Sequence, residues 1–127
     1  SEVEKIQQKN PKPIVVFITT DWCKICHGMK YTTFKDRDII QLLNDKFYFI
    51  KLNGEEKEDI TFLERTFVYK PTGINTGLHE LANQLGSMGN VMTYPTTTFL
   101  NSNFEIDLQL TGFYNSKRMK QILDKYN

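Results

Sequence analysis

The two cysteines of this 127-residue chain, Cys23 and Cys26, are separated by only two residues. A pair this close cannot staple distant parts of a small scaffold, so it indicates redox chemistry, metal binding, heme attachment or chance. The segment before it, 14–18, is continuously apolar and mostly β-branched, which predicts a strand buried on both faces. Any residue of the Thr19-Thr20-Asp21 segment could then cap a helix that begins near Trp22.

A cysteine at the start of a helix is easily made reactive. Backbone N–H groups and the positive end of the helix dipole stabilise its thiolate, and Lys24 adds a positive charge nearby. We therefore expect Cys23 to be the nucleophile and Cys26, deeper in the helix, to be the resolving thiol. Thiol-disulfide exchange requires this asymmetry, because one thiolate attacks a disulfide and the second thiol releases the mixed disulfide.

Two other kinds of site use similar spacings. A structural zinc site has about four ligands, and only His27 and His79 could join the cysteines. The segment 23–27 has the Cys-x-x-Cys-His spacing of c-type heme attachment, but it directly follows a buried strand and leaves no obvious pocket for an axial histidine. We predict no metal and no cofactor beyond a reversible Cys23–Cys26 disulfide.

Composition excludes several classes of protein. With 16 basic and 15 acidic residues the chain has a net charge of +1, which argues against a nucleic-acid partner. Its 13% of aromatic residues argues against disorder, and its longest apolar run is far shorter than the ~20 residues of a membrane span. We expect a single domain over residues 1–127 and a monomer.

The pattern along the chain predicts an α/β fold. A helix is expected from Cys23 to about Leu43, with an interruption and a second cap near 36–38, followed by a strand over 47–52. A strand, a helix and a strand in this order favour a right-handed unit with parallel strands. Short capping-box spacing from Ser1 also predicts an initial helix that ends before the prolines at 11–13.

The segment 55–77 has two interpretations. Helical spacing of apolar residues indicates a helix, whereas its strand-forming residues indicate a hairpin with a turn at Glu64-Arg65. We prefer the hairpin, which would place Phe62 opposite Phe67 and Ile60 opposite Tyr69, although its turn contains no glycine.

The last third of the chain contains clearer elements. A short helix carries Leu78 and Leu85, with Thr76 as its candidate cap, and the segments 96–100 and 105–110 form an antiparallel pair of strands. Ser116 is expected to cap the final amphipathic helix. Together these elements predict a central mixed sheet flanked by helices on both sides.

The chain resembles the thioredoxin superfamily across nearly its whole length. The resemblance is carried by Trp-Cys-x-x-Cys after an apolar strand, Lys51-Leu52-Asn53 at the end of the next strand, Tyr94-Pro95 before a Thr-rich strand, and Gly112 before the last helix. Within that superfamily it is similar to thioredoxin-related proteins, many of them exported by Bacteroidetes, that have a longer segment before the proline. The segment 55–77 is the candidate insertion.

The resemblance implies an enzyme, a thiol-disulfide oxidoreductase that acts on protein thiols and disulfides and is served by an upstream redox partner. It implies that Pro95 is a cis-proline beside the disulfide and that Tyr94 and Trp22 shape the substrate site. It also favours a periplasmic or exported protein whose signal peptide was removed before Ser1; a cytoplasmic location is the alternative.

One residue departs from the superfamily pattern. Many thioredoxins have a buried Asp that helps to deprotonate the resolving cysteine, and Phe17 occupies that position here. Proton transfer from Cys26 would then depend on water, Lys51 or His27. This departure supports an alternative, in which the chain is a binding module with slow or vestigial redox activity that docks a partner through residues 55–77.

Overall fold

The computed structural model describes residues 2–126. The elements follow in the order α1 (Glu2–Lys9), β1 (Ile14–Thr19), α2 (Lys24–Tyr31), the 3-10 helix η1 (Thr33–Lys35), α3 (Arg37–Lys46), β2 (Tyr48–Asn53), β3 (Ile60–Phe62), β4 (Arg65–Phe67), β5 (Tyr69–Pro71), β6 (Gly77–His79), α4 (Glu80–Gly86), β7 (Thr96–Leu100), β8 (Ile106–Thr111) and α5 (Ser116–Tyr126). The predicted initial helix is present, but its expected cap, Ser1, lies outside the described residues.

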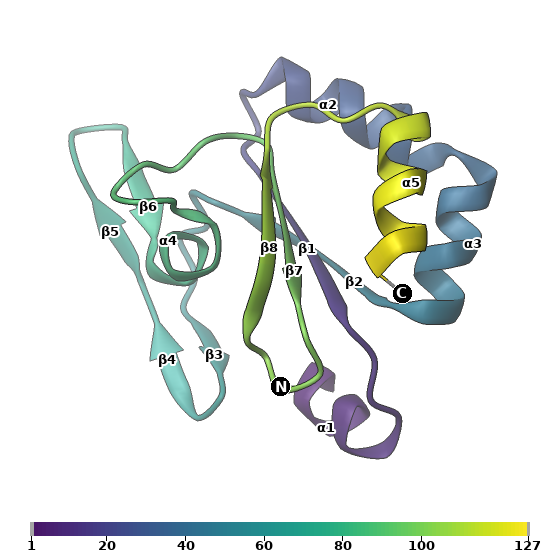
Figure 1. Ribbon diagram of the computed structural model, residues 1–127. Helices are drawn as coiled ribbons and strands as arrows, with labels where there is room; N and C mark the ends of the chain where they lie inside the picture. The colour runs from purple at the N-terminus through teal and green to yellow at the C-terminus, as the bar shows by residue number, and fades with distance from the viewer. Residues whose placement is uncertain (1, 127) are drawn as a thin grey trace.

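A mixed sheet forms the centre of the molecule (Figure 1), with strand order β2-β1-β7-β8. Strands β1 and β2 are parallel, and β7 is antiparallel to both β1 and β8. The predicted parallel unit and the mixed sheet are therefore confirmed. Because β1 is central, all of its residues except Thr19 are buried.

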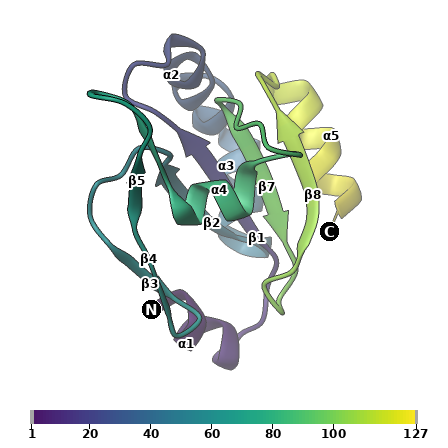
Figure 2. The ribbon, with the colours of Figure 1, turned by 90° about the vertical axis from the view of Figure 1, so that its left-hand side faces the viewer.

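Each face of the sheet is covered. Helices α2, α3 and α5 lie on one side, where Phe17, Phe99 and Met119 are fully or almost fully buried. Helix α4 and the strands of residues 60–79 lie on the other side (Figure 2), over Ile14 and Val16.

Two helices are capped by side-chain oxygens that accept backbone N–H groups. Asp36 caps α3, and Asn115 accepts the N–H of Arg118 at the start of α5. Asn115, and not the predicted Ser116, therefore caps α5.

The segment 55–77 forms strands, as predicted, but with a different turn. Strands β3 and β4 pair Ile60 with Phe67 and Phe62 with Arg65, so the turn is Leu63-Glu64. Both turn residues have positive φ, 54° and 63°, a conformation typical of the tight hairpin turns that favour glycine. The predicted turn at Glu64-Arg65 is therefore wrong by one residue and the predicted pairings are wrong by two, since Phe62 lies opposite Arg65 and not opposite Phe67.

A second hairpin replaces part of the predicted short helix. Strands β5 and β6 pair Tyr69 with His79, so Leu78 lies in a strand and α4 begins only at Glu80. The N-cap is His79 rather than Thr76: its Nδ1 accepts the N–H of Leu81 at 3.1 Å. His79 is fully buried.

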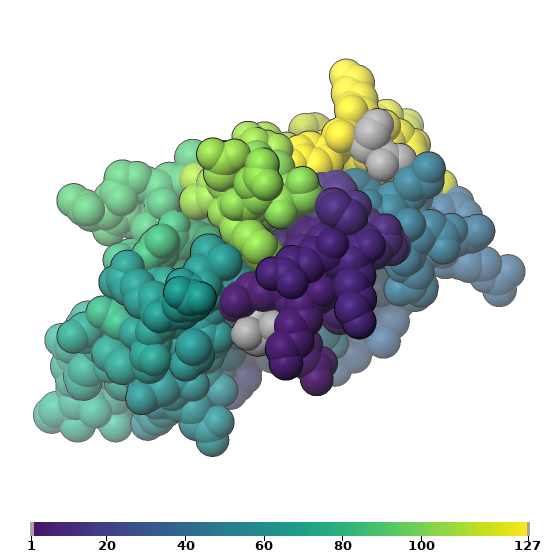
Figure 3. All heavy atoms as spheres, turned by 90° about the horizontal axis from the view of Figure 1, so that it is seen from below, coloured from purple at the N-terminus to yellow at the C-terminus, as the bar shows by residue number. Residues whose placement is uncertain are grey.

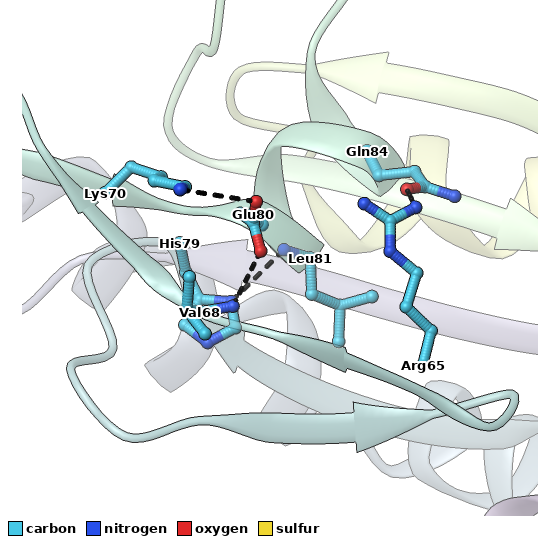
Figure 4. Close-up of polar contacts among 7 residues, drawn as sticks. All are labelled: Arg65, Val68, Lys70, His79, Glu80, Leu81 and Gln84. Carbon is cyan, nitrogen blue, oxygen red and sulfur yellow. Dashed lines mark hydrogen bonds and ion pairs between the residues drawn. The ribbon is translucent and has the colours of Figure 1, made fainter.

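Polar contacts fasten these hairpins to α4 (Figure 4). The Glu80 carboxylate accepts the backbone N–H of Val68 at 2.8 Å and lies 3.9 Å from the Lys70 ammonium. Arg65 donates to the side-chain oxygen of Gln84 at 3.4 Å. The strands of residues 60–79 are thus held against the helix that covers the sheet.

Candidate active site

The cysteine pair lies where the central strand β1 leads into α2. Cys23 is the N-cap of α2, and its sulfur accepts the backbone N–H of Cys26 at 3.1 Å. The cap is therefore Cys23 itself, and not one of the three residues 19–21 that the sequence suggested. The two sulfurs form a disulfide, with the Cα atoms 5.2 Å apart.

The two cysteines differ slightly in exposure. Cys23 is 6% exposed and Cys26 is 2% exposed, and the side chain of Lys24 between them is exposed at the start of α2. The sulfur of Cys23 meets the N-terminal end of a helix, where backbone N–H groups and the helix dipole favour negative charge. This arrangement can support thiol-disulfide exchange.

Two aromatic side chains meet beside the pair. The ring of Trp22, 64% exposed, lies edge-on to Tyr94 with centroids 5.9 Å apart. The indole Nε1 donates a hydrogen bond of 2.9 Å to Glu55. The peptide bond between Tyr94 and Pro95 is cis. The fold thus brings together Trp22, which follows β1, and Tyr94, which precedes β7.

Glu55 and Gly54 also belong to this site, although no sequence motif identified them as candidate site residues. Burial and the charge of Glu55 raise the pKa of Tyr94 to about 12. A Cβ atom on Gly54 would overlap the ring and hydroxyl of Tyr94. Both residues follow β2, and the carboxyl ends of parallel strands meet at one edge of a sheet. Their position directly after β2 is therefore the sequence feature that could have placed them at this edge.

The candidates for proton transfer belong to different elements, His27 to α2 and Lys51 to β2. The ring of His27 has Nε2 2.8 Å from the carbonyl oxygen of Asp21 and stacks on Tyr31 with centroids 6.5 Å apart. Lys51 is exposed on β2, in register with Phe17 on β1. Within residues 2–126, neither has a hydrogen bond to a cysteine sulfur, so their roles stay predictions.

An aromatic cluster occupies the place of the superfamily's buried acid. Phe17 is 1% exposed, and its ring centroid lies 4.6 Å from that of Phe34 and 6.4 Å from that of Phe49. Strand β1 contains no ionisable residue. Among residues 2–126, the buried hydroxyls of Thr20 and Thr97 have no hydrogen-bond partner, and Thr97 is in register with Phe17.

Within residues 2–126 there is no group of three or more His, Cys, Asp or Glu placed to hold a metal ion. Over the same range, every helix is too short or too polar to cross a bilayer.

Known proteins share this fold. A thioredoxin-fold protein from Helicobacter pylori superposes with a TM-score of 0.68 at 15% identity, covering 92% of this chain and 70% of that one. A disulphide isomerase from Xylella fastidiosa Temecula1 gives 0.66 at 14% identity, covering 98% and 86%. At these identities the likeness establishes the fold alone.

Curated relatives match part of the chain. An uncharacterized protein of Caenorhabditis elegans is 34% identical over 64 residues, which is 50% of this chain and 9% of that protein. Human spermatogenesis-associated protein 20 is 33% identical over 61 residues, 48% of this chain and 8% of its own length. The chain thus matches less than a tenth of these relatives.

The family described as "Thioredoxin-like domain" matches residues 1–127, the whole chain. The family, the fold and a Cys-x-x-Cys pair at disulfide distance support thiol-disulfide oxidoreductase chemistry at a general level. The chain belongs to the family of thioredoxin-like domains.

Proposed function

We propose that this protein is a thiol-disulfide oxidoreductase that exchanges disulfides with protein substrates through Cys23 and Cys26. The observation that carries the proposal is the position of Cys23, whose sulfur caps α2 and accepts the Cys26 N–H at 3.1 Å. In the reduced protein this position stabilises the Cys23 thiolate, which is the attacking species in exchange.

The reaction proceeds in two displacements. The Cys23 thiolate attacks one sulfur of the substrate disulfide, forms a mixed disulfide and releases the other substrate sulfur as a thiolate. Cys26 then loses its proton and attacks the Cys23 sulfur, which releases the second substrate thiolate and leaves the Cys23–Cys26 disulfide. A dithiol redox partner reduces that disulfide and becomes oxidised, which completes the cycle.

The second displacement is the slow step in this proposal. Cys26 is buried, and Phe17 stands where a carboxylate would accept its proton. Water, Lys51 or His27 must take that proton instead, so release of the mixed disulfide accelerates as pH rises and more thiolate forms.

Trp22, Tyr94 and Pro95 form the surface that receives the substrate. The exposed Trp22 ring supplies a flat apolar contact, and the backbone before Pro95 pairs with an extended substrate segment. Exported placement is part of the proposal and rests on the resemblance to exported thioredoxin-related proteins.

Cysteine variants test the proposal. Cys23→Ser should abolish reduction of insulin disulfides by dithiothreitol-reduced protein, whereas Cys26→Ser should accumulate mixed disulfides that a non-reducing gel resolves. A Cys23→Ser protein that reduces insulin at the parent rate would refute the proposal. The reduction potential then sets the direction: a value near about −270 mV indicates a reductant and one near about −120 mV an oxidant.

A second candidate function is a binding module with a slow disulfide. It is favoured by Phe17 in place of an acid and by Ile74, which is fully exposed in the loop between β5 and β6. A negligible exchange rate in the parent protein, together with partner capture that Ile74→Asp abolishes, would support this function over the first.

A further inference from the structure

The hydroxyl of Thr97 is a buried polar group without a hydrogen-bond partner among residues 2–126. Thr97 is 0% exposed and lies in β7, two residues after Pro95. An unpartnered hydroxyl inside a core is unfavourable, and the few such groups in native proteins call for an explanation, one of which is a redox or catalytic role. The surroundings of Thr97 show which partner its hydroxyl can take.

Thr97 faces the side of the sheet that α2 covers. It lies directly opposite Phe17 in the antiparallel pair β1–β7, and residues opposite each other in such a pair project from the same face. Phe17 packs with Met29 of α2 in the core on this side. Thr98 projects from the other face, where its hydroxyl donates to the Leu85 carbonyl of α4 at 2.8 Å. Of these two threonines, Thr97 is thus the one that faces the helix of the cysteine pair.

Cys26 faces the same side of the sheet. Cys26 and Met29 are the buried residues of α2, and residues three apart lie on one face of a helix. Because Met29 packs with Phe17, Cys26 lies one turn closer to the end of the sheet at which β1 leads into α2. The antiparallel β7 begins at that end, and Thr97 is its first residue on this face. The fold therefore places the Thr97 hydroxyl and the Cys26 sulfur on one face, at one end of the sheet.

A row of side chains crosses the sheet at the level of Thr97. Lys51, Phe17, Thr97 and Leu110 are successive partners in the registers of β2, β1, β7 and β8. Phe17 and Leu110 are apolar, and Lys51 is exposed on the edge strand β2. Thr97 is therefore the member of this row that can offer a hydrogen bond inside the core.

The end of the sheet away from the cysteines is closed. Seen from below (Figure 3), α1 in purple and the turn between β7 and β8 in light green lie side by side over that end. On the helix-covered face, Phe17, Met29 and Phe99 are at most 1% exposed. Bulk water therefore does not reach Thr97, and a partner for its hydroxyl has to come from a neighbouring side chain.

We propose that the Thr97 hydroxyl donates a hydrogen bond to the Cys26 sulfur once the disulfide is reduced, and so stabilises the Cys26 thiolate. The inference rests on the proposed exchange reaction, in which Cys26 becomes a thiolate before it attacks the mixed disulfide. In the disulfide form, the Cys26 sulfur is bonded to Cys23 and the hydroxyl has no partner. Reduction breaks that bond and lets the two sulfurs separate, which frees the Cys26 sulfur to accept the hydroxyl hydrogen.

A partner that exists only in the reduced state favours that state. The hydroxyl is unsatisfied in the disulfide form and satisfied in the dithiol form, so it raises the reduction potential of the pair. A hydrogen bond to a charged sulfur is stronger than one to a neutral thiol, so Thr97 also increases the fraction of Cys26 that is thiolate at a given pH. The hydroxyl does not take the Cys26 proton, which passes to water or to another base.

The equilibrium of the full chain with glutathione tests the proposal. Two glutathione molecules reduce the Cys23–Cys26 disulfide to two thiols and become one glutathione disulfide, and alkylation of free thiols separates the two protein forms. Thr97→Val should shift this equilibrium about tenfold towards the protein disulfide, which lowers the reduction potential by about 30 mV. Thr97→Ser keeps the hydroxyl and should resemble the parent protein. An unchanged equilibrium in Thr97→Val would overturn the proposal.

Thr98→Val is the matched control, because it removes a neighbouring buried hydroxyl on the other face of the sheet. It should leave the equilibrium with glutathione unchanged although it loses a hydrogen bond. An equal shift in Thr98→Val would show that altered packing of β7 changes the potential, and the role assigned to Thr97 would be wrong. If Thr97→Val does not fold, Thr97→Ala removes the same hydroxyl and should give the same shift.

Ionisation of Cys26 supplies a second readout. In Cys23→Ser protein, absorbance at 240 nm follows the single remaining cysteine. Adding Thr97→Val should lower the acid dissociation constant of Cys26 about tenfold, whereas adding Thr97→Ser should not change it. Identical titrations of all three proteins would contradict the hydrogen bond.

Neither measurement uses a protein substrate, so this inference and the proposed function can fail separately. A chain that does not reduce insulin but keeps the dependence of its potential on Thr97 would refute the proposed function alone. A chain that reduces insulin without that dependence would refute the role of Thr97 alone.

Discussion

The indole N–H of Trp22 donates a hydrogen bond of 2.9 Å to the carboxylate of Glu55, a residue 33 positions further along the chain. This bond links the residue before Cys23 to the segment that follows β2. Burial and the charge of Glu55 also raise the pKa of Tyr94, whose ring lies edge-on to that of Trp22. One carboxylate thus acts on both aromatic residues of the candidate active site.

Removal of this carboxylate should release the Trp22 ring. Trp22 is the single tryptophan of the chain, so its fluorescence reports this change without interference. Glu55→Ala should lower the fluorescence anisotropy and increase acrylamide quenching, whereas Glu55→Gln, whose amide oxygen still accepts the indole N–H, should resemble the parent protein. Identical quenching in all three proteins would contradict the proposed anchoring.

Tyr94 should make stability sensitive to alkaline pH. Its pKa is raised to about 12 in the folded protein, first by burial and then by the charge of Glu55, while an unfolded tyrosine has a pKa of about 10. The folded state therefore retains a proton that the unfolded state loses. The raised pKa of Tyr94 therefore contributes fully to the free energy of unfolding below about pH 10. This contribution is lost as the pH rises towards 12.

Urea denaturation between these pH values measures the effect. Tyr94→Phe should lose less stability over that interval than the parent protein, whereas the exposed Tyr31→Phe should behave like the parent. Glu55→Gln should lower the pH at which Tyr94 ionises, followed by absorbance at 295 nm. If the free energies of unfolding of Tyr94→Phe and the parent protein fell in parallel over this interval, Tyr94 would not contribute to the pH dependence of stability.

Gly54 should tolerate no side chain. Because a Cβ atom there would overlap the Tyr94 ring, Gly54→Ala should destabilise the protein by about 1–3 kcal/mol and slow disulfide exchange. Gly28, inside α2, has open space around it, so Gly28→Ala should stabilise the protein by about 0.5–1 kcal/mol. Chemical denaturation of both variants tests the contrast, and losses of equal size would contradict it.

Two neighbouring threonines of β7 should respond oppositely to the same substitution. Thr97 and Thr98 are both fully buried, but only Thr98 has a hydrogen bond, of 2.8 Å, from its hydroxyl to the Leu85 carbonyl. The Thr97 hydroxyl has no partner. Thr97→Val should therefore raise the free energy of unfolding by about 1 kcal/mol, whereas Thr98→Val should lower it by about 1–3 kcal/mol. Losses in both variants would indicate that a water satisfies Thr97.

His79 should be important for stability rather than for catalysis. Its Nδ1 caps α4, and its Nε2 lies 3.0 Å from the Glu58 carbonyl. His79→Ala removes both contacts and should cost about 2–4 kcal/mol, while His79→Asn retains a capping oxygen and should cost less. Thermal unfolding measures the stability of these variants, and a disulfide-exchange assay measures their activity. A His79→Ala variant that lost activity but kept its stability would contradict this prediction.

Features with strong local signals were predicted correctly. The apolar run of β1, a second helix cap near 36–38 and the antiparallel pair β7–β8 each depend on residues close in sequence, and the structure confirms them. The hairpin turn was misplaced because Leu63 and Glu64 adopt positive φ without glycine. Contacts of β3 and its turn with α1 and Phe104 hold that turn, and the local residue types do not reveal them.

The sequence by itself determined the segment that carries the cysteine pair, because a buried strand, a helix start and two cysteines follow one another within a few residues. Only the tertiary structure decided what surrounds that segment. Glu55 reaches Trp22 because parallel strands place their carboxyl ends at one edge of the sheet. The buried position of His79 likewise depends on where residues 55–79 pack, which is decided by contacts between segments far apart in the chain.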